Sequence, residues 1–188
     1  MSAIIASPET KLITGEELLA MGDIGPSELI DGRIVMMSPT GGEHGFIELF
    51  TLGSELAVFV RRRKLGWVLG GEVGIYIRRN PDRIRAADIA FFSKERLPHK
   101  PRKGFMEVAP ELAVEVISPD DRWEDVRQKL EDYFSIGVQW VWVVEPENHA
   151  VLVYRSVTEM QRLSDSDSLT GEGALEGFTL RVASLFEE

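Results

Sequence analysis

The order of apolar and polar positions along the chain predicts alternating helices and strands. Thr14-Gly15-Glu16-Glu17 has the spacing of a capping box and predicts a short helix that ends near Met21. The Asp31-Gly32 pair, between residues 28–30 and 33–37, predicts a β-hairpin with a tight turn. Apolar residues then recur at helical spacing from Glu43 to Lys64, which predicts a long amphipathic helix with Gly53 as a weak position; they are Phe46, Phe50, Leu56, Phe59 and Val60.

The central third of the chain has the pattern of strands. Short β-branched and aromatic runs predict strands at 67–69, 73–77 and 89–92, and the polar, basic segment 93–109 predicts a surface loop. The run 112–117 is apolar apart from Glu115 and lies between Pro110 and Ser118-Pro119, as in a buried central strand.

The last third predicts a strand–helix–strand unit followed by a hairpin. The segment 120–134 reads as a helix that ends at Gly137, with these residues on one side: Trp123, Val126, Leu130, Tyr133 and Phe134. Strands are expected at 138–144, 150–154 and 178–182. Because a crossover between parallel strands needs a connection of helix length, 112–117 and 138–144 should pair in parallel. The fold class is therefore α/β with a mixed central β-sheet flanked by helices, in a single domain spanning 1–188 with its core at about 27–155.

Composition narrows the function classes. The 188 residues include no cysteine, which excludes disulfides and thiolate metal sites. No apolar run approaches the ~20 residues of a membrane span, and Met1–Lys11 lacks the pattern of a signal peptide, so we expect a cytoplasmic protein without a membrane partner.

Charge is unevenly distributed. The formal net charge is −10, yet residues 60–103 contain 13 Lys and Arg against 4 acids, a local charge of +9. Such a segment can bind a polyanion such as DNA, although a set of solvated loop charges explains the pattern equally well.

Two acids carry the strongest chemical signal. Glu115 lies inside an apolar strand, and Asp88 begins the predicted strand at 89–92. Acids are seldom buried unless they are paired or bind a metal. Carboxylates at one level of neighbouring strands suit Mg²⁺ or Mn²⁺. The alternative is that each acid lies at a strand end and faces water.

Further side chains extend this candidate site. Lys129 borders the apolar face of its helix, from which its ammonium can reach the carboxylates; the alternative is a surface pair with Asp125. Weaker candidates are Glu28 at the hairpin mouth, His44 at a helix start, and Glu72 beside Gly70-Gly71. The aromatic residues Tyr133, Trp140 and Trp142 read as core or interface residues.

Several of these segments together resemble the Uma-type restriction endonuclease family, a branch of the PD-(D/E)XK nuclease superfamily. The resemblance rests on the segments 28–39, 85–91, 110–119, 125–133 and 137–146, together with His44. It implies a restriction-endonuclease-like core and Mg²⁺-dependent hydrolysis of DNA phosphodiester bonds, with Asp88 and Glu115 as metal ligands.

The chain departs from the superfamily pattern at two positions. Ala87 stands where the pattern has proline, and Ile117 stands where it has lysine. The resemblance implies that a lysine on the following helix replaces the missing one, and Lys129 fits.

The leading hypothesis is thus an endodeoxyribonuclease whose catalytic residues are Asp88, Glu115, Lys129, Glu28 and His44. Two alternatives remain open on the sequence. One is a catalytically inactive module on the same fold that binds nucleic acid or protein. The other is a structural protein whose acidic surface and Trp140/Trp142 strand support a homodimer.

Overall fold

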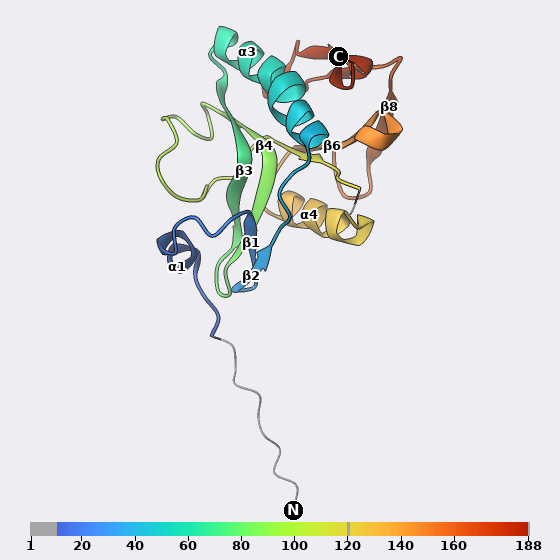
Figure 1. Cartoon of the computed structure of the whole chain (residues 1–188). Coiled ribbons are helices and arrows are strands. Elements are labelled where there is room, and N and C mark those ends of the chain that lie inside the picture. Colours follow the sequence, from blue (N-terminus) through green and yellow to red (C-terminus); the bar gives the residue numbers. More distant parts are fainter. Residues whose placement is uncertain (1–10, 120, 188) are drawn as a thin grey trace, which may run out of the picture.

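The computed structural model describes residues 11–119 and 121–187, so the predicted helix start at Asp120 and the segment 1–10 lie outside it. The main sheet has eight strands, β1 to β8 (Figure 1). Their bounds are Ser27–Ile30 (β1), Arg33–Met36 (β2), Gly66–Arg78 (β3), Arg83–Ser93 (β4), Leu112–Val116 (β5), Trp140–Glu145 (β6), Ala150–Tyr154 (β7) and Met160–Ser164 (β8). A separate two-stranded sheet contains β9 (Ser168–Thr170) and β10 (Thr179–Arg181).

The helices lie between and around these strands. They are α1 (Gly15–Ala20), α2 (Gly42–Gly45), the π-helix η1 (Phe46–Leu52), α3 (Gly53–Arg63) and α4 (Trp123–Ser135). Three short 3₁₀ turns complete the set: η2 (Pro146–Asn148), η3 (Gly173–Leu175) and η4 (Val182–Leu185). None of the helices in the described residues has the length and apolar character that a membrane crossing needs.

The main sheet is mixed and mostly antiparallel, as predicted. Its order is β2-β1-β4-β5-β6-β7-β8, with β3 paired to β4. The predicted parallel pair is confirmed, because β5 and β6 run in parallel with Leu112 opposite Trp140 and Val116 opposite Val144. The Asp31-Gly32 turn joins β1 to β2, and both residues have the positive φ that a tight hairpin turn requires.

Strand β4 has three neighbours, and this arrangement creates the site. β3 pairs along almost the whole of one edge of β4. The other edge is shared: β1 pairs at Ile84, and β5 pairs only from Ile89 to Phe91. β1 and β5 therefore diverge along β4, and the backbone between Arg85 and Asp88 faces the gap between them.

Two strand predictions need correction. The strands predicted at 67–69 and 73–77 are one strand, β3, interrupted by a bulge at Gly71 and Glu72, which both have positive φ. Asp88 does not begin its strand but lies inside the 11-residue β4, opposite this bulge, and it is only 5% exposed. The alternative of a water-facing acid at a strand end is therefore wrong for Asp88, and equally for the buried Glu115.

Each face of the sheet is covered by different elements (Figure 1). One core joins α3 and η1 to the C-terminal segment, with Phe91, Val114 and Trp142 from the strands. The other core lies under α4, which contributes Val126 and Leu130. Because alternate residues of a strand point to opposite faces, β5 and β6 are apolar on both and read as continuous apolar runs.

The long helix is confirmed, but its phase is not regular. α2, η1 and α3 follow one another without a break from Gly42 to Arg63. Phe50 was predicted on the buried face but is 71% exposed, because the π segment shifts the residues out of the 3.6-residue period. Gly53 ends that segment: a Cβ there would lie 2.0 Å from the carbonyl oxygen of Glu48, so the glycine permits the wider turn.

The other deviations lie at α4 and near the C-terminus. Trp123 was predicted on the packed side of its helix but is 49% exposed, because the first three residues of α4 face solvent and packing begins at Val126. The predicted last strand at 178–182 exists as β10, but it pairs with β9 outside the main sheet. The pattern reading did not predict β8 or β9.

Candidate active site

The divergence of β1 and β5 opens a cleft of about 830 Å³. Its wall includes all five residues predicted as catalytic, which are Glu28, His44, Asp88, Glu115 and Lys129. They come from β1, α2, β4, β5 and α4, so the fold gathers side chains that lie up to about a hundred positions apart in the sequence.

Asp88, His44 and Glu48 form a buried cluster at one side of the cleft. His44 Nε2 lies 3.1 Å from Asp88 Oδ1 and 4.0 Å from Glu48 Oε2. One ligand atom of each residue lies within 4.8 Å of the other two. The backbone holds both acids in place: Val116 N–H donates to Asp88 Oδ2 at 2.6 Å, and Gly71 N–H donates to Glu48 Oε1 at 2.6 Å.

The His44 ring is fixed on one side and open on the other. Nδ1 lies 3.3 Å from Ser118 Oγ. Nε2 is buried and makes no hydrogen bond to any of the described residues, despite its closeness to Asp88. Nε2 thus lies within ion-pair distance of two carboxylates without a regular hydrogen bond, an arrangement in which all three side chains can face one bound ion.

Glu115 belongs to a second group on the α4 side of the cleft. Lys129 Nζ donates to its Oε2 at 2.7 Å, and the Tyr133 hydroxyl donates to its Oε1 at 2.6 Å. Lys129 therefore reaches Glu115 and not Asp125, its alternative partner. Continued by one position, the β4–β5 register sets Asp88 opposite Glu115, which places the two acids at one level of adjacent strands.

Glu28 lies behind Lys129 and is held by two hydrogen bonds and one ion pair. Arg85 Nη1 donates to its Oε2 at 2.6 Å, Ala86 N–H donates to Oε1 at 3.0 Å, and Lys129 Nζ lies 3.7 Å away. Arg85 in turn binds Asp132 at 2.6 Å. Glu28 thus accepts the Ala86 backbone N–H that neither β1 nor β5 pairs with, and it connects Lys129 to the buried ion pairs of Arg85 and Asp132.

Crowding of carboxylates perturbs the site's titration. Burial, with a further contribution from the charge of Asp88, raises the pKa of Glu72 to about 7. Burial also raises the pKa of Glu115 to about 7, although Lys129 opposes the shift. The pKa of Glu48 is raised by burial as well, and that of His44 is raised because the attraction of Asp88 and Glu48 outweighs its burial. Burial, and to a smaller extent repulsion from Asp88, therefore opposes ionisation of these carboxyl groups.

The residues that line the cleft carry more negative than positive charge. Two permanent cations, Arg85 and Lys129, face seven carboxylates, which are Glu28, Glu43, Glu72, Asp88, Glu115, Asp121 and Asp125. Two carboxylates and one imidazole are a donor set that divalent cations accept, and such a cation relieves the repulsion. The residues present therefore fit a divalent ion beside Asp88.

Sequence reasoning missed two members of the site. Glu48 is four residues after His44 on a predicted helix, a spacing that puts both on one face and was available as a signal. Tyr133 was assigned to the core, and it is fully buried; the pattern contains no signal that its hydroxyl reaches Glu115.

Comparisons with known proteins identify the family and the fold. A family model, Uma2, described as "putative restriction endonuclease", matches residues 16–183. A crystal structure of a putative nuclease from Anabaena variabilis superposes with a TM-score of 0.78 at 23% identity, covering 93% of this chain and 97% of that one. At this identity the likeness establishes the fold. No curated protein matched the chain.

Proposed function

Because the chain belongs to the Uma2 family of restriction-endonuclease type, we propose that its cleft hydrolyses DNA phosphodiester bonds with the help of a divalent cation, Mg²⁺ or Mn²⁺. The observation that carries the proposal is the buried cluster of His44, Glu48 and Asp88, in which one imidazole nitrogen and two carboxylate oxygens lie within 4.8 Å of one another.

The acidic lining makes the cation necessary. A phosphodiester is itself an anion and is repelled by seven carboxylates against two cations. A divalent ion, when bound, would supply positive charge for the phosphate and lower the pKa of a water molecule. Asp88 is the ligand expected to be central, with His44 and Glu48 beside it on the helix.

Glu115 and Lys129 act on the other side of the same cleft. Each carboxylate oxygen of Glu115 accepts one hydrogen bond and keeps a second lone pair, so Glu115 can still serve as the second metal ligand predicted from sequence. The Lys129 ammonium, oriented by Glu115 and Glu28, is placed to stabilise negative charge that develops on phosphate oxygens. It thereby takes the role of the lysine that Ile117 replaces.

A cleavage assay with matched variants tests the proposal. Labelled DNA duplex is incubated with Mg²⁺ or Mn²⁺ and the parent protein, Asp88→Asn or Glu115→Gln. We expect each substitution to lower the rate at least about 100-fold. Asp125→Asn is the control, because it removes the same charge from the cleft wall without touching the cluster.

Two outcomes decide the matter. Equal cleavage by the parent and by Asp88→Asn would exclude the assigned site. Binding of duplex DNA without cleavage in either metal would instead support the inactive binding module on the same fold.

A further inference from the structure

Most of the described Lys and Arg side chains pair with carboxylates of the protein, and most of the unpaired ones lie in two segments, 61–64 and 94–103. Five of the 13 cations between residues 60 and 103 are bound within the fold: Arg78, Arg79, Arg83, Arg85 and Arg96. The other eight make no ion pair among the described residues: Arg61, Arg62, Arg63, Lys64, Lys94, Lys100, Arg102 and Lys103. All eight are exposed. Five of them, Arg61–Lys64 and Lys94, lie where α3 ends and Gly66 pairs with Ser93, and we call these five the basic end.

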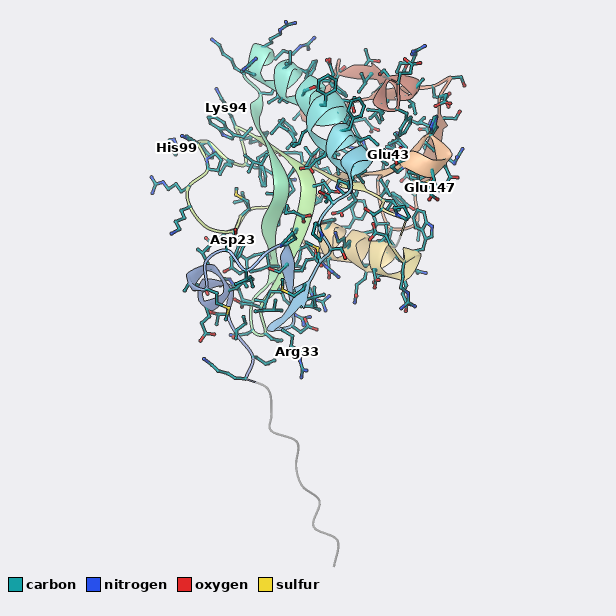
Figure 2. All side chains as sticks on the ribbon, in the orientation of Figure 1. Asp23, Arg33, Glu43, Lys94, His99 and Glu147 are labelled. Atoms are coloured by element: carbon teal, nitrogen blue, oxygen red, sulfur yellow. The ribbon has the colours of Figure 1, made fainter. Side chains whose placement is uncertain are left out.

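The two parts of the basic end meet in space. Residues 61–64 end α3, and the chain then enters β3, where Gly66 pairs with Ser93. The backbone N–H of Lys94 donates to the carbonyl of Leu65 at 2.8 Å, so Lys94 lies beside the end of α3. Lys100, Arg102 and Lys103 follow in the loop after β4, which runs back along β3 until Met106 exchanges backbone hydrogen bonds with Gly74 and Tyr76, so these three are not part of the basic end. Figure 2 shows Lys94 and His99 on the side of β3 away from Glu43. The described cations outside this segment, except Arg33 on β2, pair with carboxylates.

The basic end is separate from the acidic cleft. Lys94 is six residues after Asp88 along an extended strand, which spans about 20 Å. Arg61 is seventeen residues after His44 along a continuous helix, which spans about 25 Å. With a rise of about 3.4 Å per base pair along the axis of a DNA duplex, either path corresponds to about 6–7 base pairs of a duplex that lies along it.

We propose that the basic end binds the backbone of a DNA duplex at a point about 6–7 base pairs from the bond that lies in the cleft. This inference rests on the proposed function for the position of the cleaved bond, and on the exposed charges for the anchor. Five cations against the nearby Glu95 leave an excess of positive charge that a phosphate backbone can neutralise. Short duplexes that reach only the cleft lack this anchor.

Binding measurements on charge-matched variants test the anchor independently of cleavage. The basic-end variant carries Arg61→Gln, Arg62→Gln, Lys64→Gln and Lys94→Gln. The control variant carries Lys11→Gln, Arg127→Gln, Arg162→Gln and Arg181→Gln, which changes the net charge equally at exposed positions elsewhere. Affinity for a fluorescent 24-base-pair duplex is measured by anisotropy between 50 and 200 mM salt without divalent cations.

The anchor predicts a specific result. The basic-end variant loses at least about tenfold in affinity at low salt, and the slope of log K against log salt falls by about 3–4. In cleavage assays the parent acts on 24 base pairs with at least about tenfold higher kcat/KM than on 6 base pairs, and the basic-end variant loses that preference.

Three results would overturn the inference: an unchanged salt slope, an equal loss in both variants, or displacement of the duplex by polyglutamate at equal charge concentration. Failure of the anchor and failure of the nuclease proposal are distinguishable. Undiminished cleavage of long duplexes by the basic-end variant removes the anchor and leaves the nuclease. Loss of binding in that variant, with a parent protein that never cleaves, keeps the anchor and removes the nuclease.

Discussion

Replacing Tyr133 by phenylalanine tests the buried pair that holds Glu115. The substitution removes only the hydroxyl that donates to Glu115 Oε1 at 2.6 Å, and the fully buried ring keeps its shape. Because the hydrogen bond to Tyr133 favours the ionised carboxylate, its loss raises the pKa of Glu115 above its present value of about 7. The effect on stability therefore depends on whether Glu115 is ionised.

The size of the effect follows from that pKa. At pH 8 Glu115 is mostly ionised, and a hydrogen bond to a charged group contributes about 1.5–3 kcal/mol. At pH 5.5 Glu115 is mostly protonated, and the loss falls to about 0.5–1.5 kcal/mol, the range for neutral partners. With a urea m-value of roughly 2 kcal/mol/M, the unfolding midpoint should move by roughly 1 M at pH 8 and by about half as much at pH 5.5.

Urea unfolding at the two pH values measures this difference. Tyr154→Phe is the control, since the Tyr154 hydroxyl makes no hydrogen bond among the described residues and its removal should change stability by less than about 0.5 kcal/mol. If Tyr133→Phe is no more destabilising than Tyr154→Phe at pH 8, or costs equally at both pH values, the charged hydrogen bond has no energetic importance and the reasoning is wrong.

Three further substitutions probe other parts of the account. Glu72→Gln should stabilise the protein at pH 8, because the pKa of Glu72 is about 7 in the folded state against an ordinary 4.5, so its ionisation opposes folding. Partial exposure of the site reduces the gain to about 1 kcal/mol, and urea unfolding should show that this gain disappears below about pH 4.5. Gly53→Ala should destabilise by about 2 kcal/mol or more through its contact with the carbonyl five residues earlier, whereas Gly45→Ala, which meets nothing within 4 Å, should be neutral or stabilising in thermal melts. Lys129→Met should abolish cleavage and lower the free energy of unfolding by about 3 kcal/mol at pH 8, and by less at pH 5.5, where Glu115 is protonated. An equal loss of stability at both pH values would contradict the ion pair between Lys129 and Glu115.

Local sequence signals predicted the elements whose cause is local. The capping box of α1 forms as its spacing requires, with Thr14 and Glu17 bonded reciprocally. The Asp31-Gly32 pair makes the hairpin turn, and an apolar strand followed by a helix and a second apolar strand gives the parallel pair β5–β6. The carboxylate in the middle of β5 indicated a buried site because such a position costs free energy without a partner.

The remainder depends on tertiary contacts that no single segment contains. The bulge in β3 lies opposite Asp88 on another strand, and the π segment is recognisable only from the i→i+5 geometry that Gly53 allows. The Lys and Arg residues of segment 60–103 cannot be told apart in the sequence. In the structure Arg83 and Arg85 are bound by Asp132 on α4, whereas Lys94 has no such partner among the described residues. Ion pairing across elements therefore decided which part of the basic segment is free.

The central claim is that a divalent cation binds between His44, Glu48 and Asp88. The chain has three histidines, so NMR of their ring protons during a Mn²⁺ titration reports where a paramagnetic ion binds. The account predicts that substoichiometric Mn²⁺ broadens the His44 signals first, leaves those of His99 and His149 sharp, and loses this selectivity in Asp88→Asn. Sharp His44 signals in the presence of excess Mn²⁺, or equal broadening of all three histidines, would contradict it.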